Sequence, residues 1–334
     1  MDTLDPVIRA IDVGYGNTKY TTAVHDGQTS AAHFHSIVHR PSPIEGSFSE
    51  SDQIYDVVVR GERYQVGPGL DVVWEGGVRT LHDNFIETNG YMALVYGALS
   101  QMDIDDHIDL LVVGLPVALM NSKRQKLQAM LQGTHTVMGR EITIHRVNAV
   151  AQPLGGFMSF AGSDEDQTDL STTRNFLIDP GFFTVDFMAS TGLREIKGFS
   201  GSHSSGVSAY LKGIAKALSK DMGEPIEDIS LIDAGLISGR FKQYGKEVDL
   251  SQYHDTAIEE IMPAVEVISN KIGAGRNVDQ VILVGGGAKL FLEPLQNILT
   301  NHSIICPENS ILSNVLGFQQ IGEMWFQHQQ REVA

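Results

Sequence analysis

Two segments, one on each side of the chain's midpoint, place an aspartate at the end of an apolar strand and directly before a glycine turn. They read Asp12-Val-Gly-Tyr-Gly-Asn-Thr-Lys19 and Asp179-Pro-Gly-Phe-Phe-Thr-Val-Asp186. Glycine lets backbone N–H groups approach an anion closely, and carboxylate oxygens suit Mg²⁺. The pattern therefore predicts two hairpins that face each other and hold phosphate groups with a metal ion. Ordinary hairpins, in which Asp and Gly serve only the turn, are the alternative.

A third glycine segment, Gly285-Gly-Gly-Ala288, lies between a predicted buried strand (280–284) and a predicted helix (290–299). Consecutive glycines cost backbone entropy and pack nothing, so we expect a ligand to approach this backbone. A turn between the carboxyl end of a strand and the start of a helix suits a nucleotide base or phosphate. A merely permissive strand–helix turn is the alternative.

The elements that position these turns follow from hydrophobic periodicity. Strands are expected over 7–13, 20–24, 34–39, 55–59, 62–66, 109–114, 141–147, 175–179, 184–189 and 280–284. Helices are expected over 89–101, 122–131, 148–160, 204–220, 255–273, 290–299 and 315–329. The segment 31–71 has the character of a small inserted sheet, and the polar loop 162–174 of a junction. Because strands and helices alternate twice in similar order, the sequence predicts an α/β protein built from a duplicated unit.

Composition narrows the class of protein. The 334 residues suffice for two domains, and 42% hydrophobic with 19% charged residues is typical of a globular chain. No apolar run approaches the ~20 residues that span a bilayer, and no signal peptide is visible, so we expect no membrane association. A single cysteine makes a cytoplasmic location the default. The net charge of −17 argues against direct DNA binding, although a basic adaptor protein could mediate it.

The order of the motifs carries a resemblance to a known family. The two aspartate turns, Asn148-Ala-Val-Ala-Gln152-Pro, the glycine run and Ser313-Asn-Val-Leu-Gly317 together resemble the actin / sugar-kinase / heat-shock-chaperone ATPase superfamily. Within it the chain is most similar to bacterial actin-like plasmid-segregation proteins of the ParM/StbA type. The resemblance implies a duplicated actin-like (ribonuclease H-like) ATPase fold, with two domains around a nucleotide cleft. The expected domains are 1–160, with an insertion at about 30–80 and completed by a C-terminal helix at 315–334, and 170–314.

Site residues follow from the same resemblance. Asp12 and Asp179 would hold Mg²⁺ or its waters, and Gln152 would orient the attacking water, so that Asp12, Gln152 and Asp179 form the expected catalytic set. A neutral amide orients water but is a weak base, so slow hydrolysis is expected. The expected contacts to ATP (or GTP) are Gly14, Tyr15, Gly16, Asn17, Thr18, Lys19, Gly181, Phe182, Phe183, Thr184, Gly206, Gly285, Gly286, Gly287 and Ala288.

The second turn departs from the Gly-Gly-Thr usual in the family. Pro180 removes an amide donor, and Phe182 and Phe183 add bulk beside the phosphates. Lys212 is a further candidate for a ribose or base contact, with a solvent-facing lysine as the alternative.

Three functions are compatible with these motifs. The favoured one is an ATPase that polymerises head to tail into a filament and moves plasmid DNA through a basic DNA-binding adaptor; the polymerisation is implied by the resemblance alone. A non-polymerising nucleotide-binding regulator is the second. A small-molecule kinase of the same fold is the third, and it predicts phosphate transfer that depends on an added sugar.

Overall fold

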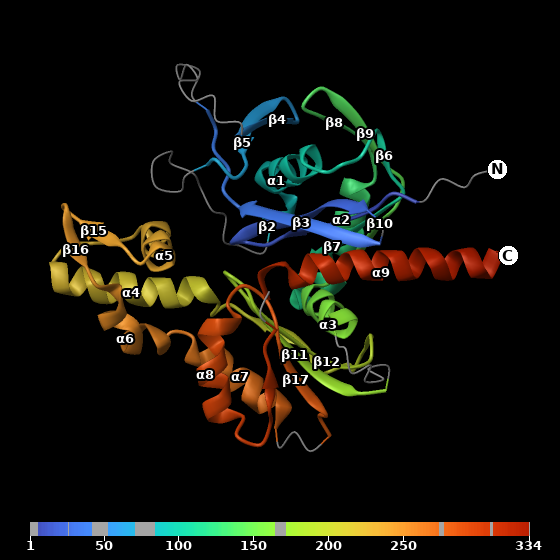
Figure 1. The fold of residues 1–334 in the computed structure, drawn as a ribbon. Coiled ribbons are helices and arrows are strands. Elements are labelled where there is room, and N and C mark those ends of the chain that lie inside the picture. The colour runs from blue at the N-terminus through green and yellow to red at the C-terminus, as the bar shows by residue number, and fades with distance from the viewer. Residues whose placement is uncertain are drawn as a thin grey trace.

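The computed structural model describes residues 6–25, 27–41, 53–70, 84–163, 172–273, 277–307 and 310–333. Two β-sheets form the two halves of the molecule, with helices between them and on their outer faces (Figure 1). Parts of the predicted insertion, and most of the predicted junction loop 162–174, lie outside the described residues.

The first sheet has five strands in the order β10-β7-β1-β2-β3. Its central strand β1 pairs antiparallel with β2 and parallel with β7, and β7 pairs parallel with β10. The strands are β1 (Ile8–Val13), β2 (Asn17–His25), β3 (Gln28–His35), β7 (Leu110–Leu115) and β10 (Val147–Ala151). Every residue of β1 and β7 is buried, as expected of strands covered on both faces.

The second sheet repeats this pattern. Its central strand β11 pairs antiparallel with β12 and parallel with β17, and β17 pairs parallel with β18. The strands are β11 (Arg174–Pro180), β12 (Val185–Thr191), β13 (Arg194–Glu195), β14 (Gly201–His203), β17 (Gln280–Leu283) and β18 (Ile304–Ile305). The predicted duplicated α/β architecture is therefore confirmed.

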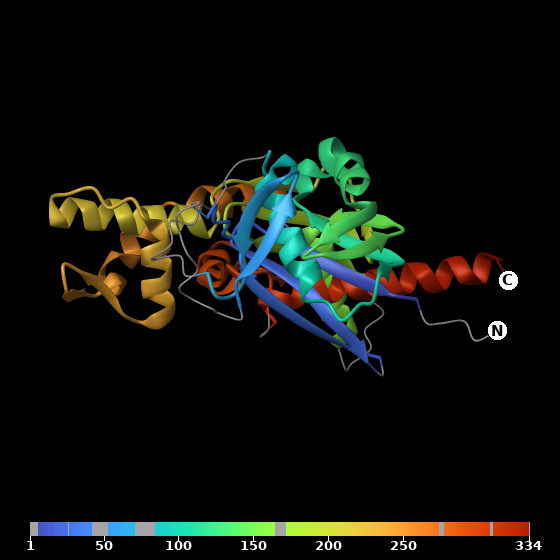
Figure 2. The ribbon, with the colours of Figure 1, turned by 90° about the horizontal axis from the view of Figure 1, so that it is seen from above.

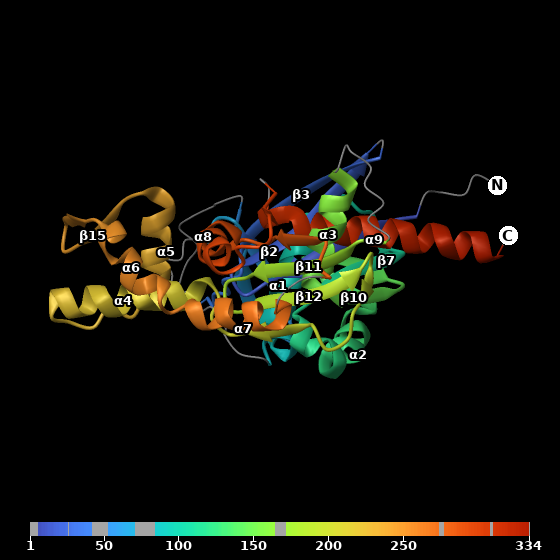
Figure 3. The same ribbon diagram turned by 90° about the horizontal axis from the view of Figure 1, so that it is seen from below.

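Each sheet is covered on both faces. Helices α3 (Gln152–Ser163) and α9 (Ser310–Val333) pack together between the sheets (Figure 1), while α1 (Asn89–Ser100) and α2 (Met120–Leu131) belong to the first half. On the outer face of the second sheet lie α7 (Met262–Ile272) and α8 (Ala288–Ile298), as the view from below shows (Figure 3). Alternate residues of β1 serve the two faces: Ile8 and Ala10 join the cluster under α9, and Ile11 and Val13 join the cluster containing α1.

Smaller elements decorate the halves. The first half carries η1 (Phe85–Glu87), the hairpin β4 (Tyr55–Val59) and β5 (Glu62–Val66), and a sheet of β6 (His107–Ile108), β8 (Gly133–Val137) and β9 (Arg140–Ile144), with η2 (Val117–Leu119) before α2. In the second half α4 (Val207–Met222) leads to an arm of α5 (Ile229–Ser238), β15 (Phe241–Gln243), β16 (Lys246–Val248), η3 (Leu250–Tyr253) and α6 (His254–Ile258). Seen from above, this arm and the C-terminal end of α9 extend to opposite sides (Figure 2).

Two predicted helices were wrong in part. Residues 148–151 form strand β10, because they pair in register with β7 in the sheet interior, and α3 begins only at Gln152 with Pro153 in its first turn. The predicted helix over 255–273 is two helices, α6 and α7. Pro263 lies at the start of α7, where its missing N–H costs nothing, whereas within a continuous helix it would remove a hydrogen bond and clash with the preceding turn.

Two predicted strands also differ. The strand expected over 141–147 divides into β9 and the start of β10, with a break at residues 145 and 146. Of the strand expected over 34–39, only residues 34 and 35 lie in a strand, at the end of β3, which runs from Gln28 to His35 as the partner of β2; His39 forms an isolated bridge with Gln65.

The crossing of α3 and α9 depends on two glycines. A Cβ on Gly317 would lie 1.8 Å from the carbonyl oxygen of Gly155, and a Cβ on Gly155 would lie 2.4 Å from the carbonyl oxygen of Asn314. Only glycine permits so close a backbone approach, so the crossing point is fixed by these residues. Within the parts of the chain that the structure describes, no helix combines the length and hydrophobicity that crossing a membrane requires.

Candidate functional site

The two predicted hairpins have the same backbone geometry. In the first, the N–H of Gly14 donates to the carbonyl of Asn17 at 3.1 Å; in the second, the N–H of Gly181 donates to the carbonyl of Thr184 at 2.8 Å. The first joins β1 to β2 and the second joins β11 to β12. We refer to residues 14–17 as loop 1 and to residues 181–184 as loop 2.

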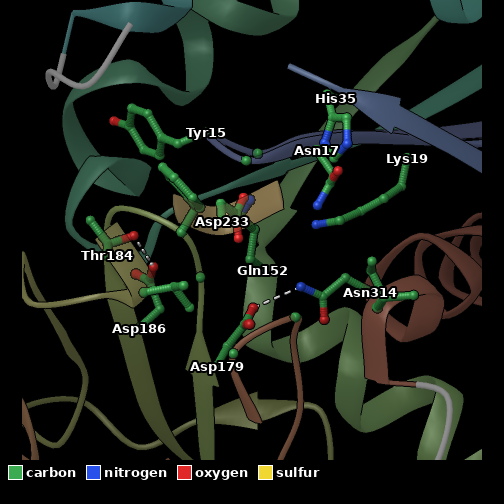
Figure 4. A pocket seen from close by; sticks show the side chains of 18 of the residues that line it. Tyr15, Asn17, Lys19, His35, Gln152, Asp179, Thr184, Asp186, Asp233 and Asn314 are labelled. Carbon is green, nitrogen blue, oxygen red and sulfur yellow. Dashed lines mark hydrogen bonds between the residues drawn. The ribbon is translucent and has the colours of Figure 1, made fainter. Parts of the chain in front are cut away.

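Both loops open onto one cavity of about 340 Å³ between the halves of the molecule (Figure 4). This volume lies within the usual range for small-molecule sites. The glycine run at the end of β17 and the start of α9 complete the wall. The lining residues are Gly14, Tyr15, Gly16, Asn17, Lys19, His35, Gln152, Asp179, Gly181, Phe182, Thr184, Asp186, Val207, Asp233, Ile237, Gly286, Gly287, Ile311 and Asn314.

Asp12 lies behind the wall, with both its oxygens occupied. Lys19 Nζ approaches Oδ2 at 2.8 Å, and Gln152 Nε2 donates to Oδ1 at 2.8 Å. The Asp12 side chain is fully buried and that of Lys19 is 12% exposed. Burial disfavours the ammonium, but the carboxylates of Asp12 and Asp179 outweigh it and raise the pKa of Lys19 above its usual value. Asp12 can reach a ligand in the cavity only when Lys19 or Gln152 moves.

Asp179 is the penultimate residue of β11, and no cationic side chain among the described residues forms an ion pair with it. Asn314 Nδ2 donates to its Oδ2 at 2.7 Å, as the dashed line in Figure 4 marks. Burial raises the pKa of Asp179 to about 7, although Lys19 and the Asn314 hydrogen bond oppose the rise. A carboxyl group with its pKa near neutrality can both accept a proton and orient a water molecule.

Asp186 faces Asp179 across the strand pair and links the two halves. Thr184 Oγ1 donates to Oδ2 at 2.9 Å, while the backbone N–H of Val117, from η2 in the first half, donates to Oδ1 at 2.7 Å. The Ser202 hydroxyl also donates to Oδ1. Burial raises the pKa of Asp186 to about 6 despite these donors.

Aromatic side chains of loop 2 pack across the gap against loop 1. A Cβ on Gly16 would lie 2.8 Å from the Cβ of Phe182, so the ring of Phe182 covers this glycine. The rings of Tyr15 and Phe183 lie 4.9 Å apart, and Tyr15 stacks on Phe85 at 5.3 Å. Apolar contact therefore joins the loops at the positions where the sequence departs from the expected glycines.

Several predicted ligand contacts lie outside the cavity. The hydroxyl of Thr18 is buried against the Ser36 hydroxyl at 2.9 Å. Gly206 sits beneath loop 2, where a Cβ would lie 2.6 Å from the carbonyl oxygen of Gly181. A Cβ on Gly285 would lie 1.9 Å from Asp179 Oδ1, so this glycine accommodates the carboxylate. Asp12, Phe183 and Ala288 are likewise absent from the wall, as is the lower-ranked candidate Lys212. Ligand roles for these residues stay predictions.

The cavity also contains residues that the sequence reasoning did not assign. Asp233 and Ile237 come from α5, which was not predicted; its signals were the N-cap Asp228, which accepts from Ser230 and Leu231, and the left-handed Gly239 at its end. The spacing of four places Asp233 and Ile237 on one helix face. Asp186 and Asn314 belong to two of the motifs described above, the second aspartate turn and the segment 313–317, but no local pattern indicated that they approach Asp179. His35, Val207 and Ile311 gave no signal.

The residues present fit a nucleotide with a hydrated cation. Lys19 supplies positive charge, and a Cβ on Gly286 would meet no atom within 4 Å, so the backbone is open to the cavity there. Two buried amide oxygens, Asn17 Oδ1 and Asn314 Oδ1, have no hydrogen-bond partner among the described residues. Unpaired acceptors in the cavity wall suit the waters of Mg²⁺, whose ligands are oxygens and water.

The arrangement described above is the actin-like two-domain α/β fold. Residues 10–155 match the family described as "Actin like proteins N terminal domain", and residues 177–297 match "Archaeal actin homologue MreB-like, C-terminal". The chain is an actin-like protein. None of the curated proteins matches it in sequence.

Solved structures agree with this fold over nearly the whole chain. The archaeal actin homolog Ta0583 is 19% identical, with 96% of this chain and 99% of that chain covered and a TM-score of 0.78. A ParM filament from Clostridium botulinum is 18% identical, with 96% and 100% covered and a TM-score of 0.78. Ta0583 in complex with ADP is 17% identical, with 95% and 99% covered and a TM-score of 0.74.

Proposed function

We propose that this chain binds ATP with Mg²⁺ in the cavity between its halves and hydrolyses the nucleotide slowly. The observation that carries the proposal is the convergence of two hairpins of the same geometry on one cavity, with Lys19, Gln152 and Asp179 at its wall. The ADP complex of a protein with a similar fold supports a nucleotide as the ligand.

Each polar residue has a distinct part in this proposal. Lys19 would turn from Asp12 toward the phosphates, and the N–H groups of the loops would surround them. Asp179, with its raised pKa, would orient the attacking water and accept its proton, while Gln152 would hold that water by hydrogen bonding. A bound Mg²⁺ would neutralise phosphate charge, and Asp12 and Asp179 would contact it through water.

We propose further that nucleotide-bound copies add head to tail into a filament, and that a basic DNA-binding adaptor couples the filament to plasmid DNA. Filament structures among proteins of similar fold, the ParM filament and the Alp12 filament (16% identity, TM-score 0.64), support assembly. The net charge of −17 suits a basic adaptor rather than DNA itself. The proposed domains are 1–160 with the helix at 315–334, and 170–314. In the structure this helix is α9 and starts at Ser310, so that Asn314 lies on it and goes with the first half.

Phosphate release and sedimentation test the proposal together. The full chain is incubated with ATP-Mg²⁺, GTP-Mg²⁺ or ADP-Mg²⁺, and both released phosphate and pelleted protein are measured. We expect slow release from ATP and a pellet that is larger with ATP than with ADP. Nucleotide binding without phosphate release contradicts the hydrolase, and a chain that stays in the supernatant at high concentration with every nucleotide contradicts the filament.

A regulator that binds nucleotide without polymerising is the second candidate, because of one observation. Phe182 and Phe183 stand at positions where the resemblance expects glycine, and both pack against loop 1. Loops joined by apolar contact resist the rearrangement that repeated turnover requires. Tight ATP binding with neither phosphate release nor a pellet would favour this candidate.

A further inference from the structure

Asn314 connects one half of the molecule to the carboxylate of the other. It lies near the start of α9, a helix that packs on strands β1 and β7 of the first sheet, yet its Nδ2 donates to Asp179 at the end of β11 in the second sheet. The donor–acceptor distance is 2.7 Å and Asn314 is 3% exposed. The hydrogen bond is thus buried, and it fixes a side chain of the second half from the first.

The internal duplication gives this contact a counterpart. Helix α3 follows β10 at one edge of the first sheet, and α9 follows β18 at the corresponding edge of the second. Near its start, each helix carries an amide side chain that donates to the aspartate ending a central strand: Gln152 to Asp12, and Asn314 to Asp179. The family resemblance implies a role for Gln152 and none for Asn314.

The orientation of the Asn314 amide follows from its partner. When Asp179 is ionised, its carboxylate only accepts hydrogen bonds, and the NH₂ group of Asn314 faces it, as the contact between Nδ2 and Oδ2 shows. Asn314 Oδ1 is then a buried acceptor for which the described residues offer no partner. A buried oxygen left without a donor costs about 1–3 kcal/mol. Because Asn314 lines the cavity, water there can supply the missing donor.

The backbone that carries Asn314 is held in place at the glycine crossing. A Cβ on Gly155 would lie 2.4 Å from the carbonyl oxygen of Asn314, and Gly317 touches the carbonyl of Gly155 one turn later. Sliding of α9 along α3 is therefore blocked on both sides. A side chain on so constrained a backbone can fix the direction of a carboxylate better than one on a loop.

We propose that Asn314 is a positioning residue for nucleotide hydrolysis, which holds the Asp179 carboxylate in the orientation that directs the attacking water. The proposal rests on the proposed hydrolase function. Asn314 acts through Asp179, and its free Oδ1 accepts a hydrogen bond from water in the cavity beside that carboxylate. Its removal affects the chemical step and leaves the nucleotide contacts of the loops in place.

Two variants and a matched control test this inference. Asn314→Asp keeps the size of the side chain and removes the N–H donor, and Asn314→Leu removes both polar atoms and keeps the branching at Cγ. Gln319→Leu is the control, because Gln319 is also a buried amide on α9 but bonds Thr21 and the carbonyl of Ile8, away from the cavity. For each full-length protein, kcat and KM for ATP-Mg²⁺ hydrolysis are measured, together with ADP affinity and the thermal unfolding midpoint.

We expect both Asn314 variants to lower kcat by about 10–100-fold, as loss of an orienting hydrogen-bond partner commonly does, with KM and ADP affinity changed less than about threefold. Gln319→Leu should lower the unfolding midpoint and keep kcat per folded molecule. A kcat near wild type in either folded Asn314 variant, or an equal loss in the control, overturns the inference; if one variant fails to fold, the other decides. If the wild-type protein binds ATP without releasing phosphate, the proposed hydrolase function is wrong. If the wild type hydrolyses ATP and the Asn314 variants do so equally fast, only the role of Asn314 is wrong.

Discussion

Loop 1 and loop 2 share a backbone but differ in the residue opposite their aspartate. Across the strand pair, Asp12 faces Lys19, whereas Asp179 faces Asp186. The first carboxylate is therefore neutralised by an ion pair at 2.8 Å, whereas the second accepts a hydrogen bond from the neutral amide of Asn314, and burial raises its pKa to about 7. The first hairpin thus carries a buried ion pair, whereas the second carries a carboxyl group that can gain or lose a proton near neutral pH.

The largest expected effect is a loss of turnover when Asp179, rather than Asp12, loses its carboxylate. Asp179→Asn keeps the shape of loop 2 and removes the group that accepts the proton, so we expect turnover to fall by about 10²–10⁴-fold while nucleotide affinity stays measurable. Phosphate release and ADP titration measure the two quantities. Wild-type turnover in this variant would end the assignment of Asp179.

Removing the Lys19 cation, on β2 beside loop 1, should lower the stability of the nucleotide-free chain. Lys19→Met leaves Asp12 as a fully buried carboxylate that keeps only the Gln152 hydrogen bond. Breaking a buried pair in this way costs about 3–5 kcal/mol. Chemical denaturation measures the loss, with the surface variant Lys126→Met as the control, because Lys126 is 61% exposed. Equal stability of the two variants would show that the ion pair contributes nothing.

The apolar contact between the loops should be smaller in effect. Phe182→Ala removes the half-buried ring that covers Gly16. We expect a loss of about 1–3 kcal/mol in unfolding free energy, less than for a fully buried ring. If these contacts also slow rearrangement of the cavity, phosphate release becomes faster in the variant. Unchanged stability would mean that Phe182 does not join the halves.

The pH dependence of the unfolding free energy should show that the aspartate beside loop 2 has a raised pKa. Between the ordinary pKa of Asp and the raised value of about 7, the folded chain binds more protons at Asp179 than the unfolded chain does. This contribution is therefore complete below about pH 4 and is lost as the pH rises through 7. Asp186, raised to about 6, behaves alike over a narrower window.

The measurement compares thermal unfolding of nucleotide-free wild type and Asp179→Asn at pH 5 and pH 8. From pH 5 to pH 8 wild type loses the contribution of Asp179, and the variant does not. The unfolding free energy of the variant should therefore rise relative to wild type, by about 1.4 kcal/mol for each pH unit over which the folded wild type binds one proton more than the unfolded chain. The raised pKa of Lys19 lies above this window, so its ammonium stays charged from pH 5 to pH 8. An equal difference at both pH values would contradict the raised pKa of Asp179.

Local sequence signals were sufficient for the central strands and for both loops. An aspartate after an apolar run and a glycine turn is a short-range pattern, and β1, β2, β11 and β12 were predicted close to their observed bounds. Residues 148–151 were assigned to a helix because their small side chains fit either structure, and pairing with β7 decided the outcome. Tertiary pairing of this kind has no signature within a short window.

The site was predictable only as far as its residues belong to the turns. Asn314 is 135 residues from Asp179 in the chain, and Val117 is 69 residues from Asp186. Contacts over such separations depend on how the halves dock, and no spacing in the sequence encodes them. Thr18 shows a further limit of local reasoning: its place in a recognised loop predicts a ligand contact, which stays a prediction, while the alternation of β2 turns its hydroxyl to Ser36.

Helix α9 gives the cavity a mechanical connection to a remote surface. Its 24 residues form a rod of about 36 Å that starts beside Asp179 and ends on the far side of the molecule. Because α9 packs on β1 and β7 and its backbone is held at the crossing with α3, it moves together with the first sheet. Any displacement of one half against the other therefore acts directly on the hydrogen bond between Asn314 and Asp179.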